Sequence, residues 1–242
     1  MRRPSALTLD LDDTLLDGEG LWESVYRVCV SLARLYPELD AADLKAANLE
    51  AWMEYWVEVE DDWTLGRLDS ASFSLEVWSR TLLACGCRDA DVARTARDLY
   101  RQFSRDTHRL YDDVQELLDY VEEANLPIAL ISNGASDVQR EKVEVLGLGD
   151  RFVAIVVSGE LGAAKPDAGP FDAAVQALGS DRSRTWHVGD NLAKDVQGAR
   201  DAGLVAVWLN RHESRRAVHD PEPDLEVESL STLVNLLRAA GG

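Results

Sequence analysis

Long apolar segments are missing from this sequence. Across its 242 residues the longest apolar runs, such as FVAIVV at 152–157, are short, whereas a helix that spans a bilayer needs about 20 apolar residues. The beginning of the chain, MRRPSALTLDL, has two arginines but no apolar stretch of useful length before the acids begin. We therefore expect neither a membrane span nor a secretory signal.

Cysteine is also scarce. The three cysteines, Cys29, Cys85 and Cys87, are odd in number and contain no C-x-x-C pair. This usage argues against a structural zinc site and favours a reducing compartment. We expect the protein to be cytoplasmic.

Basic residues are fewer than acidic residues, and lysine is much scarcer than arginine. The chain has 44 acidic and 25 basic residues, a net charge of −19, and only four of the basic residues are lysines. This balance disfavours a basic face that binds nucleic acid. The same field repels anionic substrates, so a phosphate substrate would require local cations, and a lysine within a motif becomes informative. A salt-rich cytoplasm and a GC-rich genome both explain such a composition.

What is present is an alternation of apolar runs with helix-like stretches. The runs are ALTLDL (6–11), LPIALIS (126–132), RFVAIVVS (151–158), RTWHVGD (184–190) and LVAVWLN (204–210). Fully apolar runs separated by helical patterns predict β-α units, in which helices cover both faces of a parallel sheet. The segment after the last run reads as a loop, a short extended piece and a closing helix. The fold class is therefore α/β.

The rhythm stops between Gly18 and His108. This region contains helical patterns such as DLKAANLEAWMEYWVEVE and no strand candidate. We interpret it as an all-helical insert after the first strand. Its aromatic residues, including Trp22, Trp52, Trp56 and Trp78, are expected to pack between the helices.

Polar residues gather where the predicted strands end. They are Asp10 and Asp12 after the first strand, Ser132 and Asn133 after the second, Lys165 beyond the third, and Asp190 and Asp195 after the fourth. Each alone has an ordinary explanation as a turn or helix cap. Because parallel strands end at one edge of a sheet, these residues should meet in one site. Three closely spaced aspartates there, including Asp13, imply either a bound cation or simple solvation.

The strand-end motifs DLDDTL, ISNG, KP and VGDNLAKD resemble the four motifs of the haloacid dehalogenase (HAD) superfamily. The likeness is most specific from Leu126 to Asn210. This part of the sequence resembles the subgroup that contains pyrimidine 5′-nucleotidases and N-acylneuraminate-9-phosphatases. The resemblance implies a Rossmann-like, doubly wound catalytic core formed by residues 1–17 and 109–242. A helical C1 cap would then comprise residues 18–108.

The resemblance also implies a Mg²⁺-dependent phosphatase. Its substrate would be a small phosphorylated metabolite, a phosphomonoester such as a nucleotide or sugar phosphate. Asp10 would be the nucleophile that forms an aspartyl-phosphate, and Asp12 the general acid and base. The Asp10 and Asp190 carboxylates and the backbone carbonyl of Asp12 would bind Mg²⁺, which prefers oxygen ligands.

The other motif residues would support this chemistry. Ser132 and the backbone amide of Asn133 would bind phosphoryl oxygens at a helix start. Lys165 would neutralise both the phosphate and the carboxylates. Thr14 would orient the loop after the first strand, and Asp195 would hold Lys165 or a water on the metal. The aspartate cluster is then explained by a cation, a lysine and a covalent phosphate.

Three other functions share this scaffold. A 2-haloacid dehalogenase uses the same nucleophile, but expulsion of halide needs no proton and such enzymes lack the acid that Asp12 supplies. A mutase must exclude water, and nothing in the helical region identifies a phosphosugar clamp. A non-catalytic binding protein would usually have lost a motif residue. We expect a monomer or homodimer without nucleic-acid or membrane partners.

Overall fold

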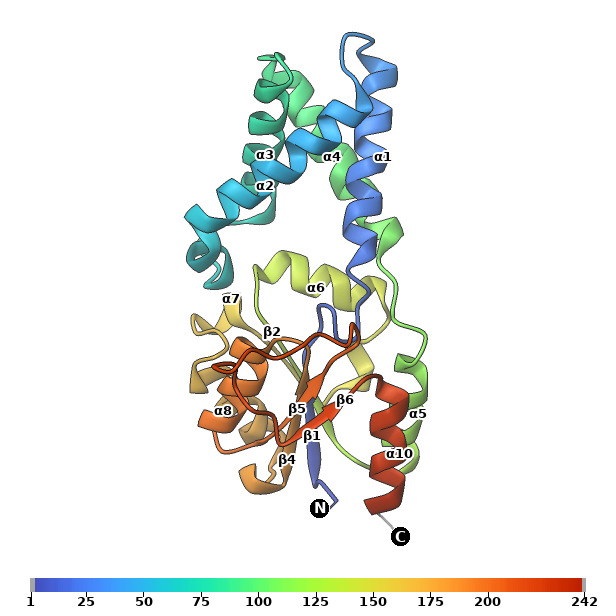
Figure 1. Ribbon diagram of the computed structural model, residues 1–242, viewed down its shortest axis with the longest axis vertical. Coiled ribbons are helices and arrows are strands. Elements are labelled where there is room, and N and C mark those ends of the chain that lie inside the picture. The colour runs from blue at the N-terminus through green and yellow to red at the C-terminus, as the bar shows by residue number, and fades with distance from the viewer. Residues whose placement is uncertain (1–2, 241–242) are drawn as a thin grey trace.

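The computed structural model describes residues 3–240, which form a parallel sheet with a group of helices beyond one of its edges (Figure 1). The strands are β1 (Ala6–Leu9), β2 (Ile128–Ser132), β3 (Ala154–Val157), β4 (Thr185–Gly189), β5 (Val205–Leu209) and β6 (Leu225–Val227). Their order is β3-β2-β1-β4-β5-β6, and every neighbouring pair is parallel. The predicted α/β class is confirmed.

The sheet is buried because helices cover both of its faces. The chain alternates strands with α5 (Val114–Glu123), α6 (Ser136–Val145), α7 (Ser158–Leu161), α8 (Ala168–Leu178), a π-helix (Leu192–Gln197), α9 (Gly198–Asp201) and α10 (Leu230–Ala240). Helices α5 and α10 lie together on one face and α8 on the other (Figure 1). Leu7 and Leu130 belong to the core of the first face, and Ile131 and Phe171 to that of the second. This two-sided burial explains why the strands read as continuous apolar runs.

Four helices follow β1 before the alternation resumes. They are α1 (Glu19–Leu35), α2 (Ala41–Thr64), α3 (Ser70–Ala84) and α4 (Ala90–Thr107), and they have a hydrophobic core of their own. The side chains of Asp40, Asp69 and Asp89 accept hydrogen bonds from backbone N–H groups at the starts of α2, α3 and α4. Such caps satisfy donors that have no partner within the helix. Within residues 3–240, the insert contains no strand, as predicted.

The expected packing of the insert's tryptophans is only partly right. Trp78 is 1% exposed and belongs to the core of the four helices. Trp22 is 40% exposed, whereas Trp52 and Trp56 are half-buried and pack against a second hydrophobic cluster that contains Phe73. Along with Trp78, these three residues border a cavity between the insert and the sheet. The helical spacing of the tryptophans did not distinguish the fully buried one from those that are partly exposed to the cavity.

In residues 3–240, no helix combines the length and the apolar character that crossing a membrane requires.

Candidate active site

The polar residues at the strand ends face a cavity of about 1310 Å³ between the sheet edge and helices α1–α4. The lining includes six of the predicted site residues: Asp10, Asp12, Asn133, Lys165, Asp190 and Asp195. The other two, Ser132 and Thr14, are buried and are not part of the lining. The parallel sheet therefore brings residues from distant parts of the sequence to one place.

Lys165 lies between two buried carboxylates. Its Nζ contacts Oδ1 of Asp10 and lies 2.6 Å from Oδ1 of Asp195. Burial would lower the pKa of Lys165, but the two carboxylates raise it above its ordinary value. Burial raises the pKa of Asp10 well above its ordinary value, and Lys165 offsets this only in part. For Asp195, burial also acts to raise the pKa, but Lys165 and His187 together outweigh it, and the pKa is lowered.

Asn133 fixes the position of this lysine. Its Nδ2 donates to the carbonyl of Lys165 at 2.8 Å, and its Oδ1 accepts from the N–H of Lys165 at 2.9 Å. The side chain of Asn133 thus joins the loop after β2 to the loop after β3. The sequence had suggested a role for its backbone amide only.

Asp195 is oriented by two further groups. Its Oδ2 accepts from the N–H of Asn191 at 3.0 Å, and its Oδ1 lies 3.2 Å from Nε2 of His187. Nδ1 of His187 lies 2.9 Å from Oγ1 of Thr8 on β1. Burial lowers the pKa of His187, which favours the neutral ring. A Cβ on Gly189 would lie 2.3 Å from Cγ of Asp195, so only glycine leaves room for this carboxylate.

The carboxylates of the site are suited to a divalent cation. Oxygens of Asp10, Asp190 and Asp195 lie within 4.8 Å of one another. Burial, followed by the charges of Asp195 and Asp13, raises the pKa of Asp190 to about 7. The charge of Lys165 therefore does not compensate the whole cluster. An all-oxygen donor set with excess negative charge fits Mg²⁺.

Asp12 has different partners from Asp10. Its Oδ1 lies 2.6 Å from Nζ of Lys142, and its Oδ2 accepts from Nε2 of Gln139 at 3.1 Å. Both partners belong to α6. Two residues of extended chain would place Asp10 and Asp12 on the same side, and both do line the cavity. The two carboxylates nevertheless contact different lysines.

Two buried hydroxyls of the site have no hydrogen-bond partner within residues 3–240, those of Ser132 and Thr14. Ser132 ends β2 and is 1% exposed, so its hydroxyl is free to bind an acceptor that is brought to it. At Thr14 the backbone carbonyl is held, since it accepts from Nη2 of Arg211 at 2.8 Å. The loop after β1 is thus fixed through its backbone and not through the Thr14 hydroxyl.

Sequence reasoning did not identify His187, Gln139 or Lys142. The scarcity of lysine could have revealed Lys142. Of the four lysines in the chain, Lys142, Lys165 and Lys194 line the cavity. In a protein that uses arginine for most of its positive charge, lysines concentrated at one site indicate a function.

Comparison with known proteins agrees with this geometry. The family model for haloacid dehalogenase-like hydrolases matches residues 4–203. The phosphoserine phosphatase of Thermus thermophilus is 34% identical over 93% of this chain and 95% of its own. The pyrimidine 5′-nucleotidase YjjG of Escherichia coli is 41% identical, over 47% of this chain and 50% of its own.

Solved structures show the same architecture. The HAD hydrolase YfnB of Bacillus subtilis, which was solved bound to magnesium, superposes with a TM-score of 0.75. It covers 98% of this chain and 99% of its own at 24% identity, a likeness that concerns the fold alone. The family model matches most of the chain, and the phosphatase relative matches over nearly its full length, so these two findings show the family as well as the fold. This chain belongs to the haloacid dehalogenase-like hydrolases.

Proposed function

We propose that this hydrolase is a Mg²⁺-dependent phosphatase that acts on a small phosphomonoester, such as a nucleotide or a sugar phosphate, through an aspartyl-phosphate. Residues 18–108 would form the cap, and residues 1–17 and 109–242 the catalytic core of a cytoplasmic monomer or homodimer. The observation that carries the proposal is the pair of aspartates with separate partners. Asp10 contacts Lys165, and Asp12 faces the same cavity with a different cation, Lys142.

These two carboxylates suit the two halves of the reaction. In the first, an oxygen of Asp10 attacks phosphorus, the bond to the leaving oxygen breaks, and Asp12 gives that oxygen a proton. In the second, Asp12 takes a proton from water, whose oxygen attacks phosphorus and breaks the bond to Asp10. Inorganic phosphate is released, and both aspartates return to their starting states.

The neighbouring groups stabilise the phosphoryl group. The unpartnered hydroxyl of Ser132 and the N–H of Asn133 would donate to its oxygens, and Lys165 would neutralise its charge. Asp195, His187 and Asn133 hold Lys165 and its surroundings in place. A Mg²⁺ ion held by Asp10, Asp190 and the carbonyl of Asp12 would supply further positive charge against the phosphate.

A 2-haloacid dehalogenase is the second candidate function. The (S)-2-haloacid dehalogenase of Pseudomonas sp. (strain YL) is 32% identical over 64% of this chain. The 2-haloacid dehalogenase of Pseudomonas syringae superposes over the whole chain with a TM-score of 0.67 and 25% identity. Asp12 disfavours this reaction, because a departing halide needs no proton.

Hydrolysis of p-nitrophenyl phosphate, with Mg²⁺ and with excess EDTA, tests the proposal. We expect activity that requires Mg²⁺ and that Asp10→Asn abolishes. Asp13→Asn is the matched control, since Asp13 belongs to the same motif but has no chemical role in the proposal. Asn tolerates the positive φ of 57° found there, so activity should stay within a few fold. Undiminished turnover in EDTA would contradict the Mg²⁺ requirement, and chloride release from chloroacetate would instead support the dehalogenase.

A further inference from the structure

Helices α1 and α2 contribute a continuous row of aromatic side chains to the cavity. It consists of Trp22, Trp52, Trp56 and Trp63, all of which line the cavity. Ring centroids of successive members lie 6.3, 5.6 and 6.5 Å apart. The rings of Trp52 and Trp56 are stacked, with 8° between their planes. We call these four residues the aromatic row.

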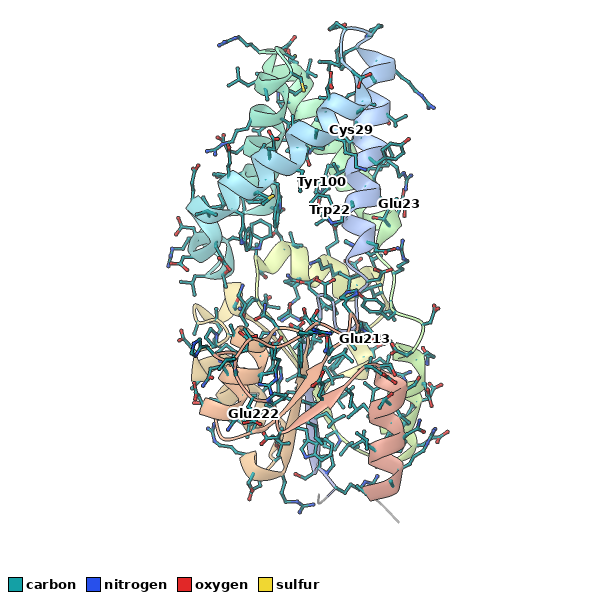
Figure 2. The ribbon with its side chains drawn as sticks, in the orientation of Figure 1. Trp22, Glu23, Cys29, Tyr100, Glu213 and Glu222 are labelled. Carbon is teal, nitrogen blue, oxygen red and sulfur yellow. The ribbon has the colours of Figure 1, made fainter. Side chains whose placement is uncertain are left out.

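The aromatic row is accessible, unlike the packed Trp78. Trp22 is 40% exposed, and the other three members are half-buried. Figure 2 shows Trp22 on the side of α1 that faces α2, with Glu23 on the opposite side. Apolar surface left open costs free energy in water, and a contiguous open patch in a cavity is typical of a ligand site.

One end of the aromatic row touches the loop that would bind phosphate. Nε1 of Trp63 lies 3.3 Å from the position that a Cβ on Gly134 would occupy. Gly134 lies two residues after Ser132 and has a φ of +144°, which suits glycine. From Trp63, the row continues through Trp56 and Trp52 to Trp22 on α1. A group bonded to a phosphate at this loop would therefore have aromatic faces beside it.

Trp56 and Trp63 are held in place by packing. The ring of Phe73, which is 9% exposed, lies 4.8 Å from that of Trp63 and 6.2 Å from that of Trp56. Large side chains fixed in this way lose little conformational entropy when a flat ligand stacks on them. The buried hydroxyl of Ser74, which has no partner within residues 3–240, also lies in the cavity lining and could bind a polar edge of such a ligand.

The charge of the cavity restricts the ligand further. Carboxylates outnumber lysines and arginines along its lining. A second anionic group on the substrate would be repelled there. The surroundings favour a leaving group that carries no negative charge.

We propose that the aromatic row binds a planar, uncharged aromatic ring in the leaving group, so that the substrates are phosphomonoesters such as nucleoside 5′-monophosphates. This inference rests on the proposed phosphatase function and adds a substrate class to it. Phosphate would bind at Ser132 and Lys165, and the ring would stack on the tryptophans of α1 and α2.

Two substrates that differ only by the ring test the inference. We compare kcat/KM for uridine 5′-monophosphate and ribose 5-phosphate, with pyridoxal 5′-phosphate as a second aromatic ester and O-phosphoserine as a ringless ester whose leaving group carries a carboxylate and an ammonium. We expect at least a 10-fold preference for uridine 5′-monophosphate over ribose 5-phosphate. In Trp22→Ala, kcat/KM for the uridine ester should fall roughly 5- to 100-fold, the usual effect of one lost stacking contact, while that for ribose 5-phosphate stays unchanged.

Tyr26→Ala is the matched control, because Tyr26 is 53% exposed on the same helix and lies outside the cavity lining. It should leave both substrates unaffected. Equal kcat/KM for ribose 5-phosphate and both aromatic esters in the wild type, or equal losses for ring-bearing and ringless esters in Trp22→Ala, would overturn the inference. A preference for pyridoxal 5′-phosphate alone would support the aromatic site and identify a different ring.

Binding without turnover separates this inference from the proposed function. Asp10→Asn should still bind uridine, with quenching of tryptophan fluorescence that weakens in Asp10→Asn/Trp22→Ala. Quenching without any hydrolysis in the wild type would support the ring site and contradict the phosphatase. Hydrolysis of ribose 5-phosphate without quenching by uridine or pyridoxine would support the phosphatase and contradict the ring site.

Discussion

Nζ of Lys142 lies 2.6 Å from Oδ1 of Asp12, so an ion pair joins α6 to the segment that follows β1. Gln139, one turn earlier on α6, donates to Oδ2 of Asp12 at 3.1 Å and to the carbonyl of Asn133 at 3.0 Å. Helix α6 therefore holds the proposed acid and the loop after β2 together. The position of Asp12 in the cavity depends on residues more than a hundred positions away.

Lys142→Met should impair proton transfer because Asp12 loses a contact that positions it in the cavity. We expect turnover of an alkyl phosphate to fall about 10-fold, toward the lower limit for lost acid–base catalysis. Turnover of p-nitrophenyl phosphate should fall less than that of the alkyl phosphate. In its first step, p-nitrophenolate departs without a proton. Lys142→Arg should restore part of the loss, which a purely structural role in α6 would not predict.

Arg140→Met is the control for this substitution. Arg140 is also on α6, but it pairs with Glu160 at 2.7 Å and does not line the cavity. Its removal should leave both rates within about twofold, as is usual for an exposed ion pair. If Lys142→Met behaves like Arg140→Met, the contact with Asp12 has no catalytic consequence.

Asp12→Asn should lower turnover by roughly 10²–10⁴-fold, the range for a lost general acid and base. The loss should be larger for a sugar phosphate than for p-nitrophenyl phosphate. With the good leaving group, phosphate should accumulate on Asp10, because Asp12 also activates the hydrolytic water. Rapid acid quench with ³²P-labelled substrate detects this species. Equal losses for both esters without trapped phosphate would assign Asp12 a structural role.

Ser132→Ala should reduce activity without reducing stability. Its hydroxyl is buried and has no partner within residues 3–240, so its removal loses no hydrogen bond in the free protein. Loss of one donor to the phosphoryl group should lower kcat by about 10²-fold. Thermal unfolding and steady-state kinetics of the same preparation measure the two effects.

Ser158→Ala provides the contrast. Its hydroxyl accepts from the N–H of Gly134 at 2.9 Å and donates to the carbonyl of Thr64. Its loss should therefore lower the free energy of unfolding by about 1–3 kcal/mol. A drop in stability for Ser132→Ala as large as that for Ser158→Ala would mean that Ser132 has a partner in the free protein.

The pH dependence of stability should reveal the uncompensated carboxylates. Because the pKa of Asp190 is raised to about 7 in the folded protein, the folded state keeps a proton that the unfolded chain releases near pH 4. The contribution of Asp190 to stability is thus present below pH 4 and is lost as the pH rises toward 7. The limit is about 1.4 kcal/mol per pH unit for one proton.

Thermal unfolding of wild type and Asp190→Asn between pH 4 and 8 measures this contribution. In EDTA, the wild type should lose stability relative to Asp190→Asn as the pH rises. Mg²⁺ should stabilise the wild type more at pH 8 than at pH 5, because the ionised carboxylate binds the ion, and should have little effect on Asp190→Asn. A wild-type-to-variant difference that does not change with pH would contradict the raised pKa.

The central residues of the site were predictable because the topology of a parallel sheet determines where the ends of its strands lie. Asp10, Lys165, Asp190 and Asp195 follow apolar runs, and parallel strands bring their carboxyl ends to one edge. Their roles came from the resemblance in the four motifs. The α/β class and the helical insert also follow from the sequence, since buried strands and amphipathic helices have different apolar periods.

Contacts that depend on how side chains turn were decided only by the tertiary structure. Asp12 was expected on the same side of the chain as Asp10, and both face the cavity, but the sequence did not reveal that its carboxylate contacts Lys142 and Gln139. His187 reads as one more residue of a buried strand, and only the pairing of β4 with β1 places it between Thr8 and Asp195. No local pattern encodes such contacts, because their partners are far apart in the sequence.

The tryptophans of the insert show the same division. Their spacing places them on helices, and it determines which residues share a helix face. It does not determine whether that face meets another helix or an open cavity, because this depends on how four helices pack and where they stand over the sheet. Packing buries Trp78 and leaves Trp22 open above the carboxylates. The sequence by itself determined which polar residues meet at the sheet edge, and the tertiary structure decided which side chains face them across the cavity.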